Sequence, residues 1–443
     1  MFTSLAYKHS PIFIQNVLLS ARGVIRRLLR EGRDQADLLA EIEQNEFDDK
    51  CLGRYSSERL SYVLDQIAPS VPFYKDVTSG QSYRLDDFPF ITKTDVKANG
   101  EAFIAGSASG VVVKGATSGT TGTPLSIKQN MTSVVREHAF TSRHLKWAGF
   151  EAGDKRAWIR GDMIVPLEQK RGPFWRYSWF ENMLLLSSFH MSSNNLQGYI
   201  DAMVEYGVEV IQAYPSSIVT LAKYLDINDE YYPSELKSIV TSSESLSIED
   251  KRLVEKRFRC TVFDWYGLFE RVAAIGSCEH GRYHILSDYS RVELIKAGEG
   301  RYEIVGTNFN NTLQPLIRYR TGDHVYLSTE SSCPCGRVFP IIDRIEGRVG
   351  DYLVGEDGQK IHILNHIPKG VEGLLATQFV QDNFDEVKVL AVVDRSVFKD
   401  THEKQLIENT KARVGKSLTV TVEIVDSLIR TNNGKIRQAI CNL

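Results

Sequence analysis

The order of apolar and polar residues divides the chain into three regions. Up to about residue 105 the apolar residues recur mainly with helical spacing, as in residues 56–67. From there to about residue 325, short apolar runs rich in β-branched residues alternate with helical stretches. The last hundred residues repeat this alternation on a smaller scale. The pattern predicts a helical beginning, an α/β middle and a small C-terminal part.

In the middle region the alternation predicts strands and helices in turn. The expected strands are residues 208–213, 238–240 and 260–263, and the expected helices are residues 216–224 and 247–258. Strands that alternate with helices form a mostly parallel sheet, with ligands at the carboxyl ends of its strands. The predicted fold class is therefore α/β.

A separate lid is expected at the C-terminus. Predicted strands at residues 387–393 and 419–425 flank a predicted helix at residues 403–415. We therefore expect a large N-terminal domain of mostly parallel sheets and helices, residues 1–347, and a small α+β lid, residues 348–443.

Composition narrows the class of partner. The chain has 443 residues, 25% charged and 42% hydrophobic, with a net charge of −3. These are ordinary globular values that indicate no nucleic-acid partner, so a small molecule is favoured and a homodimer stays open. Six cysteines, two of them Cys333 and Cys335, indicate reduced thiols or metal ligands in the cytoplasm rather than a secreted disulfide framework.

The N-terminal segment has an apolar run that polar residues interrupt. Gln15, Asn16 and several arginines break it, so neither a transmembrane helix nor a signal peptide is expected. Residues 11–30 do have helical apolar spacing with a basic face. Two interpretations stay open: a helix packed on its own domain, and attachment to an anionic membrane surface.

A loop rich in glycine and hydroxyl groups follows the apolar run at residues 110–113. Its backbone N–H groups and hydroxyls suit an anion, and phosphate is the natural ligand. A Walker loop is excluded, because a lysine would have to follow the last glycine and Thr123 and Pro124 stand there. The residues expected to bind the nucleotide phosphates are Thr117, Ser118, Gly119, Thr120, Thr121 and Gly122.

Four more motifs follow this TSGTTGTP loop: YGLFE at residues 266–270, YRTGD at 319–323, GRVGD at 347–351 and NGK at 433–435. The ordered set resembles the adenylate-forming superfamily of acyl-CoA synthetases and luciferases. Within it, the chain looks most like the phenylacetate-CoA ligase branch. The closest likeness is to CapK-like proteins of capsular polysaccharide biosynthesis, which share the Cys-x-Cys-Gly-Arg element seen at residues 333–337.

The resemblance assigns roles to residues of the nucleotide site. Glu270 matches the Mg²⁺-associated glutamate, and a hard carboxylate oxygen is the ligand that Mg²⁺ prefers. Tyr266 and Gly267 match positions against the adenine, and Glu244 lies where the family has a loop beside it. Asp323 matches the aspartate that accepts hydrogen bonds from both ribose hydroxyls.

Each of these carboxylates also has an ordinary interpretation. Glu270 could be a solvated or Arg271-paired surface residue, Asp323 part of a Gly-Asp turn, and Glu244 part of a helix N-cap. The chain departs from the family at Phe269, where Thr or Ser is usual, so one hydroxyl contact is missing.

The resemblance assigns three further residues to the C-terminal lid and its junction with the large domain. Arg348 lies at the junction with the lid, and Asp351 is the hinge about which the lid rotates. Lys435 matches the catalytic lysine that neutralises charge in the adenylation transition state, and its alternative is a solvated lysine in a turn.

The acid pocket is expected around residues 213–216 and 187–190, with Tyr214 and His190 as candidate lining residues. Their aromatic character suits an apolar or aryl acid, but the same residues also suit a core.

A zinc site is a separate expectation. Cys278, His284, Cys333 and Cys335 supply the four ligands of a closed tetrahedral site, with His280 as an alternative to His284. Buried free thiols are the other interpretation. Bound zinc would be structural and would join the segment after Glu270 to the segment before the hinge.

The predicted reaction is the one that the resemblance implies. ATP, Mg²⁺ and a small organic acid give acyl-AMP and pyrophosphate, and CoA then takes the acyl group. An amine acceptor in surface-polysaccharide modification and a nucleotide-binding protein without turnover are the alternatives, and Phe269 is the feature that favours the second.

Overall fold

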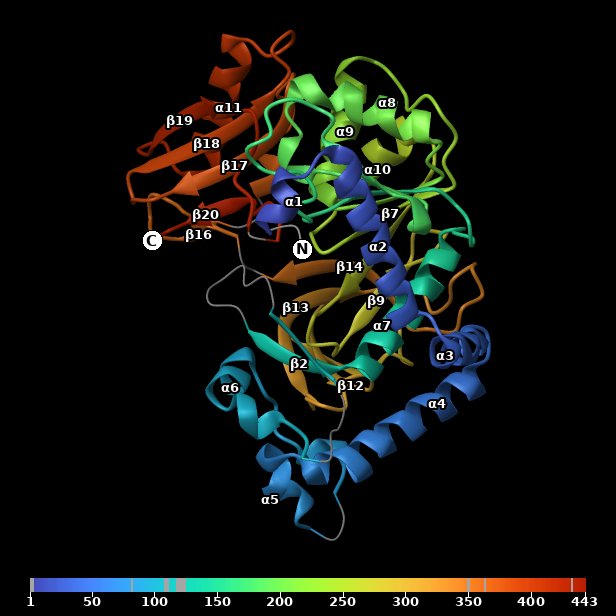
Figure 1. Ribbon diagram of the computed structural model, residues 1–443. Coiled ribbons are helices and arrows are strands. Elements are labelled where there is room, and N and C mark those ends of the chain that lie inside the picture. The colour runs from blue at the N-terminus through green and yellow to red at the C-terminus, as the bar shows by residue number, and fades with distance from the viewer. Residues whose placement is uncertain are drawn as a thin grey trace. The chain divides into compact units, whose positions relative to one another are not determined.

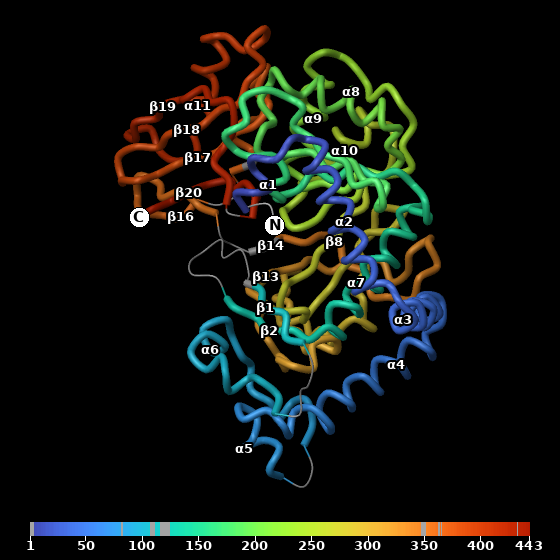
Figure 2. Tube along the Cα trace, in the orientation of Figure 1, coloured from blue at the N-terminus to red at the C-terminus, as the bar shows by residue number. Residues whose placement is uncertain are grey.

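The computed structural model describes residues 4–80, 83–106, 111–116, 125–348, 351–361, 364–431 and 433–443. The chain divides into two compact units, each built from separate segments. Unit 1 comprises Met1–Gly23, Glu151–Val262 and Val349–Leu443, and unit 2 comprises Val24–Phe150 and Phe263–Arg348. Figures 1 and 2 trace these segments by colour along the chain. Among the described residues, no helix has the length and apolar character needed to cross a membrane.

Unit 1 contains a sheet with the strand order β7-β6-β3-β5-β4. Its strands are β3 (Arg156–Ile159), β4 (Trp175–Ser178), β5 (Met183–Leu186), β6 (Val210–Ala213) and β7 (Ser238–Ser242). Strand β3 pairs in parallel with β5 and β6, and β6 with β7, whereas β4 is antiparallel to β5. The parallel part follows from strands that alternate with helices along the chain.

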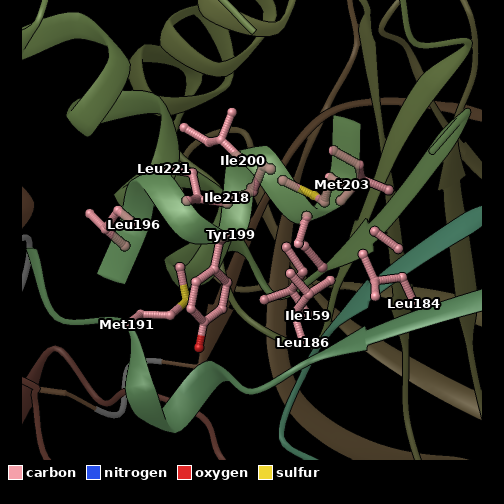
Figure 3. Close-up of a cluster of buried hydrophobic side chains, with 14 of the residues drawn as sticks. Ile159, Leu184, Leu186, Met191, Leu196, Tyr199, Ile200, Met203, Ile218 and Leu221 are labelled. Carbon is pink, nitrogen blue, oxygen red and sulfur yellow. The ribbon is translucent and has the colours of Figure 1, made fainter. Parts of the chain in front are cut away.

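The helices of this alternation are α8 (Leu196–Tyr206), α9 (Pro215–Ile227) and α10 (Ile248–Phe258). Gly207 ends α8 in the left-handed region with φ 73, which glycine adopts without strain. Figure 3 shows apolar side chains of α8 and α9 against those of the neighbouring strands. Among them are Tyr199 and Leu221 from the helices and Ile159 and Leu184 from the strands, all fully buried. This apolar core fixes the loops that follow the strands.

Two N-terminal helices begin the chain, α1 (Leu5–His9) and α2 (Ile12–Arg30). The helix predicted at residues 11–30 is thus confirmed. Its buried residues are mainly polar, however: Gln15, Asn16, Leu19, Ser20 and Gly23. Its residues 12–23, which belong to unit 1, therefore pack within that unit with the side that sequence patterning would assign to solvent.

The C-terminal part of unit 1 has its own sheet of order β19-β18-β17-β20. Its elements are β17 (Leu374–Gln381), β18 (Glu386–Val393), α11 (Asp400–Val414), β19 (Thr419–Ile424) and β20 (Ala439–Cys441), preceded by the strand pair β15 (Leu353–Val354) and β16 (Lys360–Ile361). Leu375, Leu390 and Val392 also belong to the apolar core around α8 and α9. The domain boundary expected at residues 347/348 stays a prediction.

Unit 2 is built on antiparallel strands in the order β11-β12-β13-β14-β10-β9-β8. The strands are β8 (Thr261–Gly267), in which the chain passes from unit 1 to unit 2, β9 (Ala274–Ser277), β10 (Tyr283–Ile285), β11 (Ser290–Lys296), β12 (Arg301–Asn308), β13 (Tyr319–Leu327) and β14 (Ile341–Arg348). A separate hairpin consists of β1 (Val112–Ala116) and β2 (Ser126–Asn130).

The helices of unit 2 are α3 (Arg33–Gln44), α4 (Asp49–Ser61), α5 (Lys75–Thr78), α6 (Lys93–Ala98) and α7 (Met131–Trp147). Helix α4 continues into a π-helical turn at Tyr62–Ile67, within the segment predicted to be helical. Asn130 caps α7 by accepting the Ser133 N–H at 2.8 Å.

The predicted strands and helices of the middle region and of the last hundred residues are confirmed, as β6, β7, β8, β18, β19, α9, α10 and α11. The α/β fold class is likewise confirmed. The antiparallel sheet of unit 2 is an addition that the pattern did not indicate.

Candidate active site

The phosphate loop expected at Thr117–Gly122 lies outside the described residues. Its flanks form the β1–β2 hairpin, in which Ala116 pairs with Ser126. Both of these strands belong to unit 2.

Asp323 and Tyr266 meet in unit 2. The Tyr266 hydroxyl donates a hydrogen bond of 2.7 Å to Asp323 Oδ2, and the Asp323 side chain is buried. Asp323 lies within β13, and Gly322 before it has φ 72, which accommodates an irregularity in the strand. The alternative that Asp323 belongs to a Gly-Asp turn between elements is wrong, because the strand continues through it.

Glu270 lies directly after β8 and is only 1% exposed. The Tyr319 hydroxyl donates to Glu270 Oε1 at 3.2 Å. The alternative of a solvated surface glutamate is therefore wrong. The neighbouring Arg271 is held by Gln129 and Glu137.

Phe269 packs against the β1 strand. A Cβ added at Gly115 would lie 2.2 Å from Phe269 Cζ, so the aromatic ring requires a glycine opposite it. The ring joins the apolar cluster of unit 2 at the position where the family usually has a hydroxyl. Phe269, the residue that departs from the family pattern, thus packs on Gly115 of the same unit.

In unit 1, Glu244 connects two segments that are distant in sequence. Its Oε2 accepts the Ser216 N–H at 2.9 Å, in the first turn of α9, and its Oε1 accepts the Ile436 N–H at 3.0 Å. A carboxylate is favoured at a helix N-terminus by the helix dipole. The N-cap of α10 is Ser247, so the alternative that Glu244 belongs to that cap is wrong.

Lys435 lies in a short loop near this carboxylate. An isolated bridge between Arg430 and Ile436 closes the loop, and Thr431 exchanges hydrogen bonds with Lys435: its N–H donates to the Lys435 carbonyl at 2.9 Å, and its hydroxyl accepts the Lys435 N–H at 3.2 Å. The backbone at Lys435 is therefore fixed, and its side chain is half-buried.

A pocket of about 330 Å³ opens in unit 1 at the carboxyl end of β3. The residues that line it are Trp158, Arg160, Gly161, Asp162, Tyr214 and Asn433. Tyr214 donates to the Asn433 carbonyl at 3.0 Å, and the Trp158 indole donates to Asp162 at 2.7 Å. The pocket is thus bounded partly by the Asn-Gly-Lys loop.

Arg160 is the cation of this pocket. Its guanidinium lies 4.8 Å from the Trp158 ring centroid and 5.0 Å from that of Tyr214, and it donates to Ser243. Burial lowers the pKa of Arg160 and raises that of Tyr214. Sequence reasoning found Tyr214 but missed the Trp158–Asp162 segment. No strand was predicted at residues 156–159, so the sequence pattern did not mark the charged residues that follow β3.

His190 is not among the described residues that line the pocket. Its ring stacks on Phe174 with 4.7 Å between centroids, and its Nδ1 hydrogen-bonds the Ser187 hydroxyl at 2.8 Å. Burial lowers its pKa. These contacts favour the core interpretation of His190.

Arg348 and Asp351, at the expected junction and hinge, lie on either side of residues 349–350, which are outside the described part of the chain. Asp351 accepts from Arg437 at 3.1 Å and from the Gln438 N–H at 2.6 Å, so it anchors the approach to β20. Arg348 ends β14 opposite Asp323, and its side chain is not described. The hinge role of Asp351 stays a prediction.

The four expected zinc ligands come together in unit 2. The ligand atoms of Cys278, His284, Cys333 and Cys335 all lie within 4.8 Å of one another. Cys278 Sγ lies 3.6 Å from Cys333 Sγ, and Cys335 Sγ lies 3.5 Å from His284 Nε2. The histidine of the cluster is His284, whose Nε2 faces the thiols.

Comparison with known proteins shows which proteins this chain is similar to. The CapK C-terminal domain family matches residues 353–442. Protein CapK of Staphylococcus aureus is 28% identical, over 99% of both chains. The phenylacetate-coenzyme A ligase of Pseudomonas putida is 24% identical, over 68% of this chain and 72% of that protein. The chain is thus similar to CapK and to phenylacetate-coenzyme A ligases.

A solved structure shares the fold of this CapK-like chain. The 2-hydroxyisobutyryl-CoA ligase in its postadenylation state superposes with a TM-score of 0.63 at 17% identity, over 90% of this chain and 91% of that one. The resemblance drawn from the five motifs is confirmed.

Proposed function

We propose that this CapK-like ligase activates a small organic acid with ATP and transfers the acyl group to CoA. A carboxylate oxygen of the acid attacks the α-phosphorus of ATP, the bond to the β-phosphate breaks, and pyrophosphate leaves. The CoA thiolate then attacks the acyl carbon, and AMP leaves with the bonding electron pair.

The observation that carries the proposal is the pair of buried carboxylates in unit 2. Burial of a carboxylate costs free energy unless hydrogen bonds offset it, and Asp323 and Glu270 are each bonded to a tyrosine. Buried charged groups of this kind occur preferentially at functional sites. We assign Asp323 to the ribose hydroxyls and Tyr266, with Gly267, to the adenine face.

Mg²⁺ fits the other carboxylate. Glu270 offers the hard oxygen donor that this ion prefers. The preceding residue, Phe269, packs against Gly115 of the β1–β2 hairpin, so Glu270 lies in a segment next to this hairpin. When bound, Mg²⁺ neutralises part of the triphosphate charge. Glu270 would hold it, and Tyr319 would orient the carboxylate.

We assign Lys435 to the charge that develops on the α-phosphate. Backbone hydrogen bonds hold the main chain at Lys435, and Ile436 joins it to Glu244, so the backbone that carries this lysine is held before substrate binds. Preorganisation of this kind lowers the activation free energy without reorganisation during the reaction.

The pocket beside this loop is our candidate for the acid. Tyr214, Trp158 and Gly161 give it aromatic and narrow walls, whereas Arg160 and Asp162 make it polar. This lining supports an acid that carries a polar group in addition to its carboxylate. His190 is not assigned to this pocket, because it packs on Phe174.

The acceptor is the part with a real alternative. The phenylacetate-coenzyme A ligase relatives support CoA. An amine acceptor in surface-polysaccharide modification is the alternative. A protein that binds nucleotide without turnover is the third possibility, and it is distinguished by ATP binding without pyrophosphate.

The test is pyrophosphate release by the full chain with Mg-ATP across aryl, hydroxy, fatty and amino acids, with and without CoA. We expect release with one class of acid and a thioester product only with CoA. A product formed with an amine but not with CoA would assign an amine as the acceptor in place of CoA. ATP binding with no release for any acid would contradict the ligase assignment.

We further propose that the cluster of three cysteines and His284 holds one structural Zn²⁺. Three thiolates and an imidazole are a standard donor set for a closed tetrahedral site. Cys278 and His284 flank the β9–β10 connection, and Cys333 and Cys335 lie between β13 and β14. Zinc would therefore tie two connections of the same sheet together. The Arg337 guanidinium, which pairs with Glu46 and Glu279, adds positive charge beside the thiolates.

Metal analysis of the purified chain tests the zinc proposal. We expect about one zinc per chain in the wild type, and its loss with a lower melting temperature in Cys333→Ser, because structural zinc contributes to folding free energy. Cys51→Ser is the matched control: Cys51 is a half-buried cysteine on α4 of the same unit, outside the cluster. A metal-free wild type that melts at the same temperature with and without added zinc would contradict the proposal.

A further inference from the structure

Helix α2 is oriented with its polar side toward the protein. Asn16 Oδ1 accepts the Tyr177 N–H at 3.0 Å, and the Ser20 hydroxyl accepts the Trp179 N–H at 3.0 Å. Gln15 accepts from the fully buried Arg176 and donates to the Tyr7 carbonyl. The polar side chains therefore satisfy backbone groups along β4, which stands last in the strand order of its sheet.

The opposite side of α2 is apolar and open to solvent. Its exposed fractions are 66% for Phe13, 57% for Ile25, 75% for Leu28 and 55% for Leu29, and Val17 is also exposed. Spacings of three, four and eight residues place these side chains on one face. A contiguous apolar face of this kind on a protein surface marks a binding surface rather than a structural one.

Two aromatic residues extend this face. Trp179 and Phe180 follow β4 and are 45% and 66% exposed, and the Phe13 ring lies 5.9 Å from that of Trp179. Aromatic rings of this type favour the boundary between water and lipid.

The charges on α2 identify the partner. Arg22, Arg26, Arg27 and Arg30 lie on this helix of 19 residues, which contains no aspartate or glutamate. At about 100° per residue, Arg22 and Arg26 border the apolar face on one side and Arg27 borders it on the other. A second copy of the helix would bring arginine toward arginine, whereas an anionic lipid surface accepts both borders at once.

We propose that α2, together with Trp179 and Phe180, docks this protein on an anionic membrane surface. The helix lies in the plane of the interface with its apolar face in the lipid, and the arginines contact the anionic headgroups. Its polar face remains on β4. The inference is independent of the nucleotide and acid assignments.

The test is co-sedimentation of the full chain with vesicles of phosphatidylcholine alone and of phosphatidylcholine mixed with an equal part of phosphatidylglycerol. We expect binding to the anionic vesicles that falls with added salt, and much weaker binding to the neutral ones. The double variant Phe13→Ser with Leu28→Ser should bind about tenfold or more weakly, because two apolar side chains leave the lipid. The melting temperature of each variant shows that it is folded.

Phe384→Ser is the matched control, because Phe384 is equally exposed, at 65%, in the turn between β17 and β18. It should bind vesicles as the wild type does. Equal vesicle binding by the double variant, or no binding by the wild type, would overturn the proposal. A wild-type dimer that becomes a monomer in the double variant, without vesicle binding, would assign the face to a second copy of the chain instead.

Discussion

The two compact units hold their polar side chains in different ways. In unit 2, Asp323 and Glu270 are buried and bonded to the hydroxyls of Tyr266 and Tyr319. In unit 1, the polar residues around Arg160 line an open pocket, and Lys435 is placed by the backbone of a short loop. The two carboxylates of unit 2 are held by side-chain hydrogen bonds, whereas the pocket of unit 1 leaves space for a ligand. We therefore expect changes in unit 2 to act on nucleotide affinity and changes in the Lys435 loop to act on turnover.

The largest effect is expected at Lys435. Lys435→Ala should reduce pyrophosphate release by about 10²- to 10³-fold and leave ATP binding nearly unchanged, because the charge acts mainly in the transition state. The rate is measured at saturating ATP and acid, and the affinity by equilibrium binding. Lys416→Ala, an exposed lysine in the same C-terminal part, is the control. Full activity in the Lys435 variant would remove this residue from the mechanism.

A smaller effect, on binding instead of rate, is expected at Asp323. Asp323→Ala should weaken ATP binding by at least about 10- to 100-fold, because even one hydrogen bond to a charged group contributes about 1.5–3 kcal/mol. Asp343→Ala is the control, since Asp343 lies exposed on β14 of the same unit. An ATP affinity equal to that of the wild type would contradict the ribose assignment.

The smallest effect is expected from the tyrosine that orients Asp323. Tyr266→Phe keeps the ring and removes the hydrogen bond of 2.7 Å, so ATP affinity should fall by about three- to tenfold, in line with a net contribution of about 1 kcal/mol for one hydrogen bond. The turnover number at saturating ATP should stay close to that of the wild type. A selective loss of turnover would assign Tyr266 to the chemical step. It would then contradict the expectation that changes in unit 2 act on nucleotide affinity.

Sequence reasoning worked best where spacing along the chain carries the information. The strands and helices of the alternating regions were predicted because periodicity reflects which side of an element is buried. The four possible metal ligands were also found, because Cys and His are few and their chemistry is specific.

Prediction from the sequence failed where a residue's role depends on which distant residue it contacts. Nothing local in the sequence indicates that Phe269 faces Gly115, or that Glu244 bonds to Ser216 at the start of α9 instead of capping α10. The pocket residues Arg160 and Asp162 were missed because only the fold brings them beside Asn433.

Helix α2 shows most clearly what each level determines. Its residues determined by themselves that a helix forms with one apolar and one polar face, because that follows from local spacing. Only the tertiary structure decided which face turns inward: Asn16 and Ser20 accept hydrogen bonds from the backbone N–H groups of Tyr177 in β4 and of Trp179 directly after it, and such groups need partners where they are buried.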